Sequence, residues 1–225
     1  MTSPGVTTKE KDYSTFVSQV SSTVVGCVGG ATRGPVNEEV LLTSPQQFLN
    51  TFGEPTPDAL ATYSALQFLQ EGNKLYYVRV GSWGDSETGK AELEVMDTET
   101  SPSSVLIITA NTPGTWGNDI AVNILAGDTE IEFTLEVIFD GEIQEEFECS
   151  LDDTADKYVE DVVDSDYVDV EDQQSGSGAS IETLDEAYLS GGDDGLSSID
   201  SSDIIGSDNT EGLKIFSNKE KIDVN

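Results

Sequence analysis

The segment ALATYSALQFLQEGNKLYYVRV, residues 59–80, decides the fold of the first ninety residues. Four of its apolar residues are spaced four, three and three positions apart, which places them on one face of a helix: Ala59, Tyr63, Leu66 and Leu69. Gly72 stands where a helix C-cap is expected, and residues 74–80 (KLYYVRV) are rich in strand formers. The segment therefore predicts a helix followed by a strand.

The residues before this unit predict two further strands and a second helix. Residues 22–28 (STVVGCV) and 39–43 (EVLLT) are short β-branched apolar runs. The Ser-Pro pair at 44–45 supplies an N-cap and a first helical residue, so we expect a helix that runs to the glycine at position 53. The order strand, strand, helix, helix, strand predicts an α/β (α+β) core layer.

Charge divides the chain into stretches of different composition. The sequence holds 44 Asp and Glu against 10 Lys and Arg, with no histidine, which gives a formal net charge of -34. Residues 1–90 carry nine acids and six bases, residues 91–213 carry 33 acids and one base, and residues 214–225 carry two acids and three lysines. The composition changes from nearly balanced to strongly acidic and then back. This indicates an acidic domain inserted into a more balanced core.

The acidic middle of the chain is predicted to be β-rich. Its apolar residues alternate with polar ones, most clearly over residues 130–139 (EIEFTLEVIF). This alternation predicts a strand with one solvent-exposed and one buried face. Asp140-Gly141 is a two-residue hairpin signal. The predicted strands cover residues 92–96, 105–110, 120–125, 130–139 and 142–149. We further predict a helix at 155–163, a flexible loop at 173–179, a helix at 210–217 and a strand from Ile222.

Composition excludes several classes of function. Without histidine the chain has no Ser-His or Cys-His catalytic pair and no imidazole metal ligand. The acidic surface disfavours nucleic acid and anionic membranes as partners, and no apolar run is long enough to span a bilayer. The N-terminus has no apolar core typical of a secretory signal. Cys27 and Cys149 are 122 positions apart, so a reducing compartment without structural disulfides is the simpler expectation.

Residues 84–90 match the phosphate-loop spacing GxxxxGK, but the details oppose nucleotide binding. Ala91 replaces the hydroxyl residue that would bind Mg²⁺, and Asp85 and Glu87 would repel phosphate. The alternating segment that follows does not predict a helix with an anion-binding N-terminus. We therefore expect a surface turn.

The acid-rich run 161–172 suggests calcium, but it lacks the central glycine and regular ligand spacing of an EF-type loop. A solvated acidic face is the favoured interpretation. With 44 acids in the chain, no particular carboxylate pair is marked as hydrolytic. Cys27 lies in an apolar run without a histidine to activate it, so we expect a core thiol. No catalytic, metal or cofactor site is predicted.

Five motifs, in the same order along the chain, resemble the N-terminal portion of contractile phage tail sheath proteins. They are SPGVTTKEKDYS (3–14), STVVGCVGGATRGPVNEEVLLTSPQQFLNTFG (22–53), ALATYSALQFLQEGNKLYYVRV (59–80), PGTWGN (113–118) and LSGGDDG (189–195). The resemblance spans almost the whole chain. Because sheath proteins are longer, with a C-terminal part that contacts the tail tube, it implies that this chain is a portion of such a protein.

The resemblance implies a domain organisation that agrees with the charge pattern. Residues 1–18 would form an extended N-terminal linking arm, and residues 19–90 together with 196–225 would form part of the conserved sheath core. Residues 91–195 would be an inserted acidic β-rich domain. The sequence of the arm taken alone would favour a frayed terminus, whereas the resemblance favours the arm.

The resemblance also implies a function. The chain would be a non-enzymatic structural subunit of a virion tail, assembled in the host cytoplasm as a helical array of rings around the tail tube. Contraction of the array would drive the tube through the host cell envelope for genome ejection. The implied partners are neighbouring sheath subunits, the tail tube protein, and baseplate and tail terminator proteins, with no cofactor, nucleic acid or membrane.

Particular residues take roles under this resemblance. Strand addition from the arm of one subunit to the sheet of its neighbour would use Pro4, Gly5, Val6, Thr7, Thr8 and Tyr13. Structural turns are expected at Gly114, Trp116, Gly117, Gly191, Gly192 and Gly195, with the tryptophan covering an apolar surface. Arg79 is expected to pair with an acid, either of a neighbouring subunit or of its own chain.

Two alternatives stay open at this point. A virion-surface or calcium-dependent binding and adhesion β domain is the competing class of function. The acidity of the middle segment fits either an outer surface whose charge keeps particles apart or an adaptation to a saline habitat.

Overall fold

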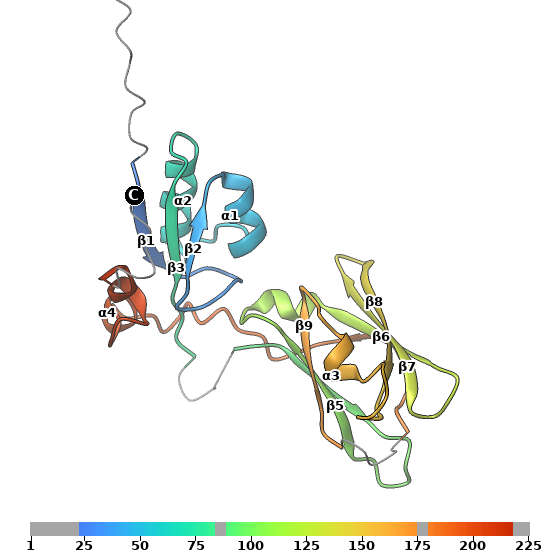
Figure 1. The fold of residues 1–225 in the computed structure, drawn as a ribbon. Coiled ribbons are helices and arrows are strands. Elements are labelled where there is room, and N and C mark those ends of the chain that lie inside the picture. Colours follow the sequence, from blue (N-terminus) through green and yellow to red (C-terminus); the bar gives the residue numbers. More distant parts are fainter. Residues whose placement is uncertain (1–22, 84–88, 175–179, 218–225) are drawn as a thin grey trace, which may run out of the picture.

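The computed structural model describes residues 23–83, 89–174 and 180–217. Helices and strands are both present, and Figure 1 shows them gathered into two bodies. We name them the α/β body (residues 23–83 and 196–217) and the β body (residues 89–174 and 180–195). Each has its own hydrophobic core. The mixed α and β content agrees with the predicted fold class.

The α/β body is built on a three-stranded sheet with the order β1-β3-β2. Its strands are β1 (Val25–Gly29), β2 (Glu39–Leu42) and β3 (Leu75–Arg79). The central strand β3 is parallel to β1 and antiparallel to β2. The sheet therefore has two outer edges, and in the described part of the chain no further strand pairs with either.

Two helices, α1 (Pro45–Phe52) and α2 (Leu60–Leu69), cover one face of this sheet. The predicted caps of α1 are confirmed, because the Ser44 side chain accepts the Gln47 N–H and Gly53 ends the helix with φ of 79°. The aromatic rings of α1 pack on Tyr77 of β3, at 5.1 Å from Phe48 and 4.8 Å from Phe52.

The predicted buried face of α2 is partly wrong. Tyr63 is 46% exposed, and the buried residues of the helix are Thr62, Ala65 and Leu69. The reason is close packing on β1, where a Cβ placed on Gly29 would lie 2.2 Å from the Cβ of Ala61. The helix presents its small residues to the strand at this approach, which rotates the tyrosine to the surface.

C-terminal residues cover the opposite face of the sheet. The 3₁₀ helix η2 (Gly212–Ser217) lies on this face, and its Ile215 packs on the buried Val78 and Val80, whereas α4 (Ser201–Ile205) packs on η2. The helix predicted at 210–217 is therefore a shorter 3₁₀ helix, and α4 was not predicted. The strand predicted from Ile222 lies outside the described residues.

The β body consists of two antiparallel sheets on one common core. The sheet of order β10-β6-β7-β8 contains β6 (Ala121–Ala126), β7 (Glu132–Phe139), β8 (Glu142–Ser150) and β10 (Leu184–Tyr188). The sheet of order β4-β5-β9 contains β4 (Glu92–Met96), β5 (Ser104–Ala110) and β9 (Val168–Asp172). All five predicted strands are present.

The period-two pattern of β7 places Phe133, Leu135 and Val137 in the core, as predicted. The hairpin to β8 turns at Asp140 and Gly141, both with positive φ, of 54° and 75°. Positive φ at both central residues is the geometry of a type I′ turn, which matches the twist of the flanking strands.

Three elements of the β body differ from the prediction. Strands β9 and β10 were not predicted, and the helix predicted at 155–163 is reduced to α3 (Val159–Val162). In β9 the valines at 168 and 170 alternate with acids, and the high density of acids hides this pattern. The loop predicted at 173–179 lies largely outside the described residues. In the described parts of the chain, no helix combines the length and apolarity needed to cross a bilayer.

Candidate functional site

The two bodies meet around the side chain of Arg79, the last residue of β3. This side chain is fully buried. Its Nη1 donates to the carbonyl oxygens of Gly34 and Pro113, both at 2.8 Å, and its Nη2 donates to the carbonyl of Asp194 at 3.3 Å. Gly34 belongs to the α/β body, whereas the other two carbonyls belong to the β body. One guanidinium therefore ties three loops together across the junction.

A carboxylate of the same chain was one expected partner of Arg79, and this prediction is wrong. The side chain bonds to backbone carbonyls, because three loops converge on the end of β3 and leave their carbonyls directed at it. Burial lowers the pKa of Arg79 to about 10, against the opposing effect of the nearby Asp194 charge. The guanidinium is therefore still protonated at neutral pH.

Trp83 closes the junction where the chain leaves the α/β body. Its indole N–H donates to the carbonyl of Asp193 at 2.7 Å, and the Arg79 guanidinium carbon lies 5.9 Å from its ring centroid. Gly195, with φ of 65°, lies against this ring, and a Cβ there would come within 2.5 Å of it. The outgoing and returning segments of the chain thus pack on one another.

The PGTWGN and LSGGDDG motifs form two turns that bind each other. The Asn118 side chain donates to the Gly192 carbonyl at 3.0 Å and accepts the Gly192 N–H at 2.8 Å. The Asp194 carboxylate accepts the backbone N–H of Thr115 at 2.7 Å and its hydroxyl at 3.0 Å. Two motifs about 75 residues apart in the sequence therefore form one polar unit beside Arg79.

Glycines allow the backbones of this unit to approach one another. A Cβ on Gly192 would lie 2.3 Å from the carbonyl oxygen of Gly114. A Cβ on Gly114 would in turn lie 2.1 Å from the carbonyl oxygen of Thr32 in the α/β body. Gly117 sits against the methyl groups of Ala91 and Ala110, with no room for a side chain.

Trp116 and Gly191 complete the set of predicted turn residues. Trp116 is half-buried against the core of the β body, with its ring centroid 6.0 Å from that of Phe139. Gly191 has φ of 87° and open space around it, so it serves the turn through its conformation alone. The structural role of the six turn residues remains a proposal. The predicted linking-arm residues, Pro4, Gly5, Val6, Thr7, Thr8 and Tyr13, lie outside the described residues.

A cleft of about 560 Å³ opens beside the junction. Arg33 and Pro35 line it from the α/β body, and Trp116 and Tyr167 line it from the β body. Arg33 donates to the carbonyls of Leu49 (3.2 Å) and Asn50 (2.6 Å) at the end of α1. The cleft thus separates the bodies on one side of the Arg79 contact.

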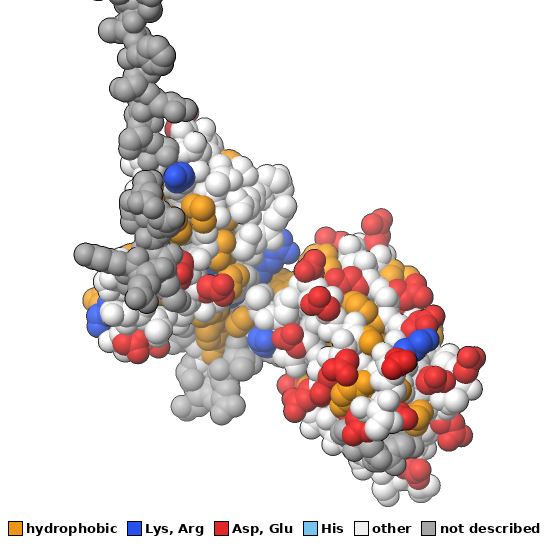
Figure 2. Space-filling model, viewed as in Figure 1, with side chains coloured by type: hydrophobic (Ala, Val, Ile, Leu, Met, Phe, Trp, Pro, Cys, Tyr) orange, Lys and Arg blue, Asp and Glu red, His pale blue; other side chains and the backbone are white. Residues whose placement is uncertain are grey.

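The acid-rich run 161–172 spreads over α3, a connecting segment and β9. Its valines at 168 and 170 point inward, whereas Asp161, Asp164, Asp166, Asp169 and Glu171 are exposed. Among the residues that the structure describes, no group of three or more His, Cys, Asp or Glu is placed to hold a metal ion. Figure 2 shows acidic side chains distributed over the visible face of the β body.

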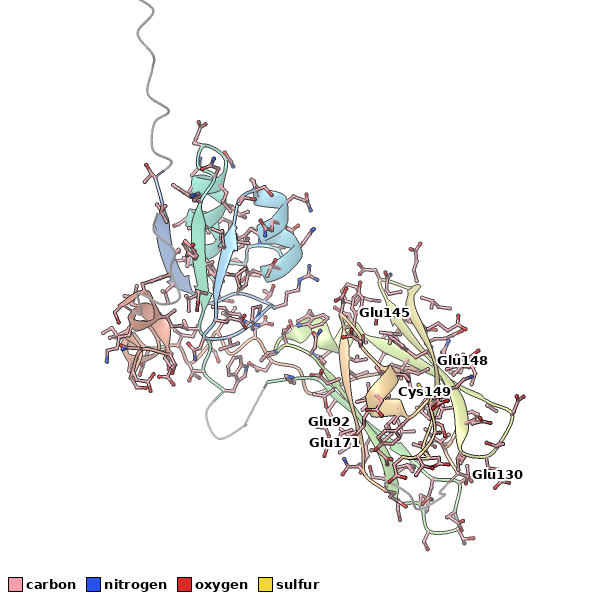
Figure 3. The ribbon with its side chains drawn as sticks, in the orientation of Figure 1. Glu92, Glu130, Glu145, Glu148, Cys149 and Glu171 are labelled. Carbon is pink, nitrogen blue, oxygen red and sulfur yellow. The ribbon has the colours of Figure 1, made fainter. Side chains whose placement is uncertain are left out.

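The acids labelled in Figure 3 are spread over β4, β8, β9 and the turn before β7, and the two on β8, Glu145 and Glu148, have separate partners. Glu145 on β8 accepts the backbone N–H of Asp166 at 3.0 Å, and Glu148 forms an ion pair with Lys157. The neighbouring Cys149 is buried, and burial raises its pKa to about 12, so it is an inert thiol at neutral pH. Cys27, the other thiol, is half-buried beside the core of the α/β body, and burial raises its pKa as well.

Gly89 and Lys90, the described residues of the GxxxxGK segment, make contacts at the junction. The Gly89 carbonyl accepts the N–H groups of Gly114 (3.0 Å) and Asp193 (2.9 Å), and Lys90 pairs with Asp169 at 3.3 Å. Of these groups, Lys90 is the one that a phosphate loop would direct at an anion, and here it pairs with a carboxylate.

Comparison with known proteins finds similarity in sequence and in structure. No protein-family profile matches the chain. The tail sheath protein of Enterobacteria phage T4 is 32% identical over 147 residues, which are 63% of this chain and 21% of that protein. The chain therefore corresponds to about a fifth of the curated relative.

The structural matches have the same family name. A sheath tail protein from Desulfitobacterium hafniense matches 85% of this chain and 39% of its own, with 18% identity and a TM-score of 0.51. A sheath tail protein from Listeria innocua matches 76% of this chain and 34% of its own, with 13% identity and a TM-score of 0.50. The chain is thus similar in sequence to the phage T4 tail sheath protein, and similar in fold to these two sheath tail proteins, over part of their length.

Proposed function

We propose that this chain is part of a structural, non-enzymatic subunit of a contractile phage tail sheath. The observation that carries the proposal is the sequence identity to the phage T4 tail sheath protein over 147 residues. The two structural matches support it through the fold. The subunit would belong to the virion tail and polymerise in the host cytoplasm as a helical array of rings around the tail tube.

The proposed domain organisation has a core shared with other sheath proteins and an acidic insert. Residues 19–90 with 196–225 would be the core, and residues 91–195 the insert. Support comes from the separate hydrophobic cores and from the path of the chain, which leaves the α/β body after β3 and returns to cover the same sheet with residues up to 217. A unit that leaves and re-enters its host at adjacent points is what an insertion produces.

The proposed link between subunits is strand addition by the N-terminal arm, residues 1–18. The three-stranded sheet supports this link because it ends in edge strands on both sides. An edge strand presents unpaired N–H and C=O groups that a strand from another chain can pair with. Because such a contact joins unlike surfaces, it repeats without closing and generates a filament.

The proposed work of the array is contraction. Backbone pairing depends little on side-chain packing between the moving bodies, so it can survive large rigid-body rotation of neighbouring subunits. The proposed partners are neighbouring sheath subunits, the tail tube protein, and baseplate and terminator proteins.

The acidic insert is proposed to face outward. Residues 91–195 carry 29 acids against one base, and the acids of the 161–172 run lie largely at the surface. Mutual repulsion between such surfaces keeps large particles soluble and apart. Assembly that is lost in low salt would instead favour adaptation to a saline habitat.

Electron microscopy of the purified full-length protein tests the proposal. We expect rings or striated cylinders, and we expect deletion of residues 1–16 to leave a folded, soluble subunit that forms neither. A Lys9→Gln/Lys11→Gln variant is the matched control, because it changes the charge of the arm and keeps its backbone. Ordered arrays built by the deletion variant would contradict the linking role of the arm.

A further inference from the structure

The cleft beside the junction has walls that are fixed relative to each other. The buried Gly34 of the α/β body lines it, and its N–H donates to the hydroxyl of Thr112 in the β body at 3.2 Å. The Gly34 carbonyl accepts from Arg79, which also bonds to the carbonyl of Pro113. These bonds join the two bodies at the cleft, so its volume of about 560 Å³ is a property of the fold.

Aromatic rings line the cleft on the side of the β body. Trp116 and Tyr167 both line it and are half-buried. Both rings pack on Phe139, at centroid distances of 6.0 Å and 5.5 Å, which holds them on one side of the cleft. Pro35 adds an apolar side chain from the α/β body. The cleft therefore offers apolar ring surfaces from both bodies.

Several hydrogen-bond acceptors of the lining residues are already used within the protein. The Asn50 side-chain oxygen accepts from Gln46 at 2.9 Å, and the Asn50 carbonyl accepts from Arg33 at 2.6 Å. The Asp166 carbonyl accepts from the side chain of Asn111, whereas the Asp166 side chain is exposed to solvent. The two bonds to and from Gly34 occupy two further acceptors.

Two donors of the lining residues have no acceptor. The Nε of Arg33 and the indole nitrogen of Trp116 are buried, and no atom of the described residues accepts a hydrogen bond from either. Burial of a donor without an acceptor is unfavourable, and most buried polar groups in proteins have a partner. One of these donors comes from each body. A ligand of the cleft therefore gains most by bringing acceptors and least by bringing donors.

We propose that this cleft binds a proline-rich peptide segment in the polyproline II conformation. Proline contributes a backbone carbonyl but no N–H, so each residue brings an acceptor without a donor that needs a partner. Its ring packs on aromatic side chains, and peptides of this conformation bind in aromatic-lined grooves. A saccharide hydroxyl brings a donor with every acceptor oxygen, and an anionic ligand would be repelled by the exposed Asp166. This inference goes beyond the proposed role in a tail sheath and does not depend on it.

The first experiment follows the indole N–H signals by NMR while decaproline is added to the full chain. The sequence has two tryptophans, and Trp83, whose indole bonds to the Asp193 carbonyl at 2.7 Å, does not line the cleft. Because the Trp116 N–H is covered, we expect its ring to turn on binding and its signal to shift until saturation. The Trp83 signal should stay unchanged, and a Gly-Ser peptide of equal length should shift neither. An unshifted Trp116 signal, or an equal shift with the Gly-Ser peptide, would overturn the proposal.

Calorimetric titration of variants tests where decaproline binds. Trp116→Phe keeps an aromatic ring and removes the N–H, so we expect binding about fivefold weaker, the effect of one hydrogen bond. Tyr167→Ala removes a ring from the cleft and should weaken binding at least about tenfold. Tyr188→Ala is the matched control, because Tyr188 is an exposed tyrosine of the same body that does not line the cleft.

Thermal unfolding checks that each of these variants is folded. Equal affinities of Tyr167→Ala and Tyr188→Ala would place the peptide outside the cleft and overturn the proposal. If Tyr167→Ala does not fold, Trp116→Phe decides the question, and an affinity equal to that of the unsubstituted protein would contradict the role of the indole N–H.

Competition identifies the chemistry of the ligand. We expect that neither maltohexaose nor hexaglutamate displaces decaproline, because the first brings donors and the second brings negative charge. Displacement by hexaglutamate would show that the cleft recognises anions through Arg33. Displacement by maltohexaose would show that it recognises hydroxyl groups. Either result would overturn the assignment of a proline-rich peptide.

Discussion

The α/β body and the β body both bury the apolar faces of their sheets, but they cover these faces with different elements. The α/β body covers both faces of a small mixed sheet with helices and C-terminal residues, and it leaves strand edges at its sides. The β body packs two antiparallel sheets on each other and turns its acids outward. Strand edges are surfaces with which another chain can pair, whereas surfaces of like charge repel one another.

The junction determines whether the two bodies act as one. Replacement of Arg79 by Met removes three bonds to buried carbonyls, and we expect the largest effect here, a loss of about 3 kcal/mol or more in unfolding free energy. Calorimetry should show two separated transitions in place of coupled unfolding. Arg79→Lys keeps the positive charge but lacks the planar guanidinium. Its unfolding free energy should therefore lie between those of the unsubstituted protein and Arg79→Met. An unchanged single transition in Arg79→Met would mean that the bodies are coupled through other contacts.

Two adjacent glycines, Gly191 and Gly192, test how tightly the two turns at the junction pack. Gly192→Ala would place a Cβ 2.3 Å from the Gly114 carbonyl oxygen, so one of the two turns must move, at a cost of about 1–3 kcal/mol. Gly191→Ala meets open space and costs only the strain of a positive φ, about 1 kcal/mol. Urea denaturation should rank Gly192→Ala as the more destabilised. The reverse order would indicate that the turns are not tightly packed.

The smallest effect concerns charge within the β body. Glu136 on β7 and Glu146 on β8 lie directly opposite each other, and like charges in register are destabilising. We expect Glu146→Gln to raise the unfolding free energy by about 0.5 kcal/mol at low salt, with a smaller gain at high salt. Unfolding curves at two salt concentrations measure this. A gain that does not depend on salt would point to a cause other than charge.

Glu148→Gln is the matched variant on the same strand, with the opposite sign. Its hydrogen bond with Lys157 lowers the pKa of Glu148 below the ordinary 4.5. A lowered folded-state pKa means that the ion pair stabilises the protein above pH 4.5, and that this contribution is lost as the pH falls through the folded value. Glu148→Gln should therefore destabilise slightly at neutral pH and have no effect in acid. Stabilisation at neutral pH would contradict the ion pair.

Local signals made much of the fold predictable. Ser44 with Pro45 and Gly53 set the bounds of α1, and Asp140-Gly141 set the hairpin between β7 and β8. In each case the residues that decide the structure are a few positions apart and act through backbone geometry. Strand β9 escaped prediction because acids surround its two valines, and α4 because it is a single short turn.

The candidate site was predictable in its parts and not in its assembly. The PGTWGN and LSGGDDG motifs could be found as turns, but no local signal shows that Asn118 binds Gly192. The contact of Gln47 with Leu41 and Thr43 was missed, since one glutamine in a helix gives no sign that its amide returns to the preceding strand. The partner of Arg79 was predicted as a carboxylate because acidic residues can be identified in a sequence. Every residue has a backbone carbonyl, so the sequence does not indicate which carbonyls will face the guanidinium.

The sequence by itself determined most of the elements, the uneven distribution of charge and the motifs that resemble sheath proteins. Each depends on neighbouring residues or on composition, which folding does not change. Tertiary structure alone decided which loops meet at Arg79 and which strand Gln47 contacts. These contacts join segments far apart in the chain, so their geometry exists only after the sheet and its two covering layers have packed.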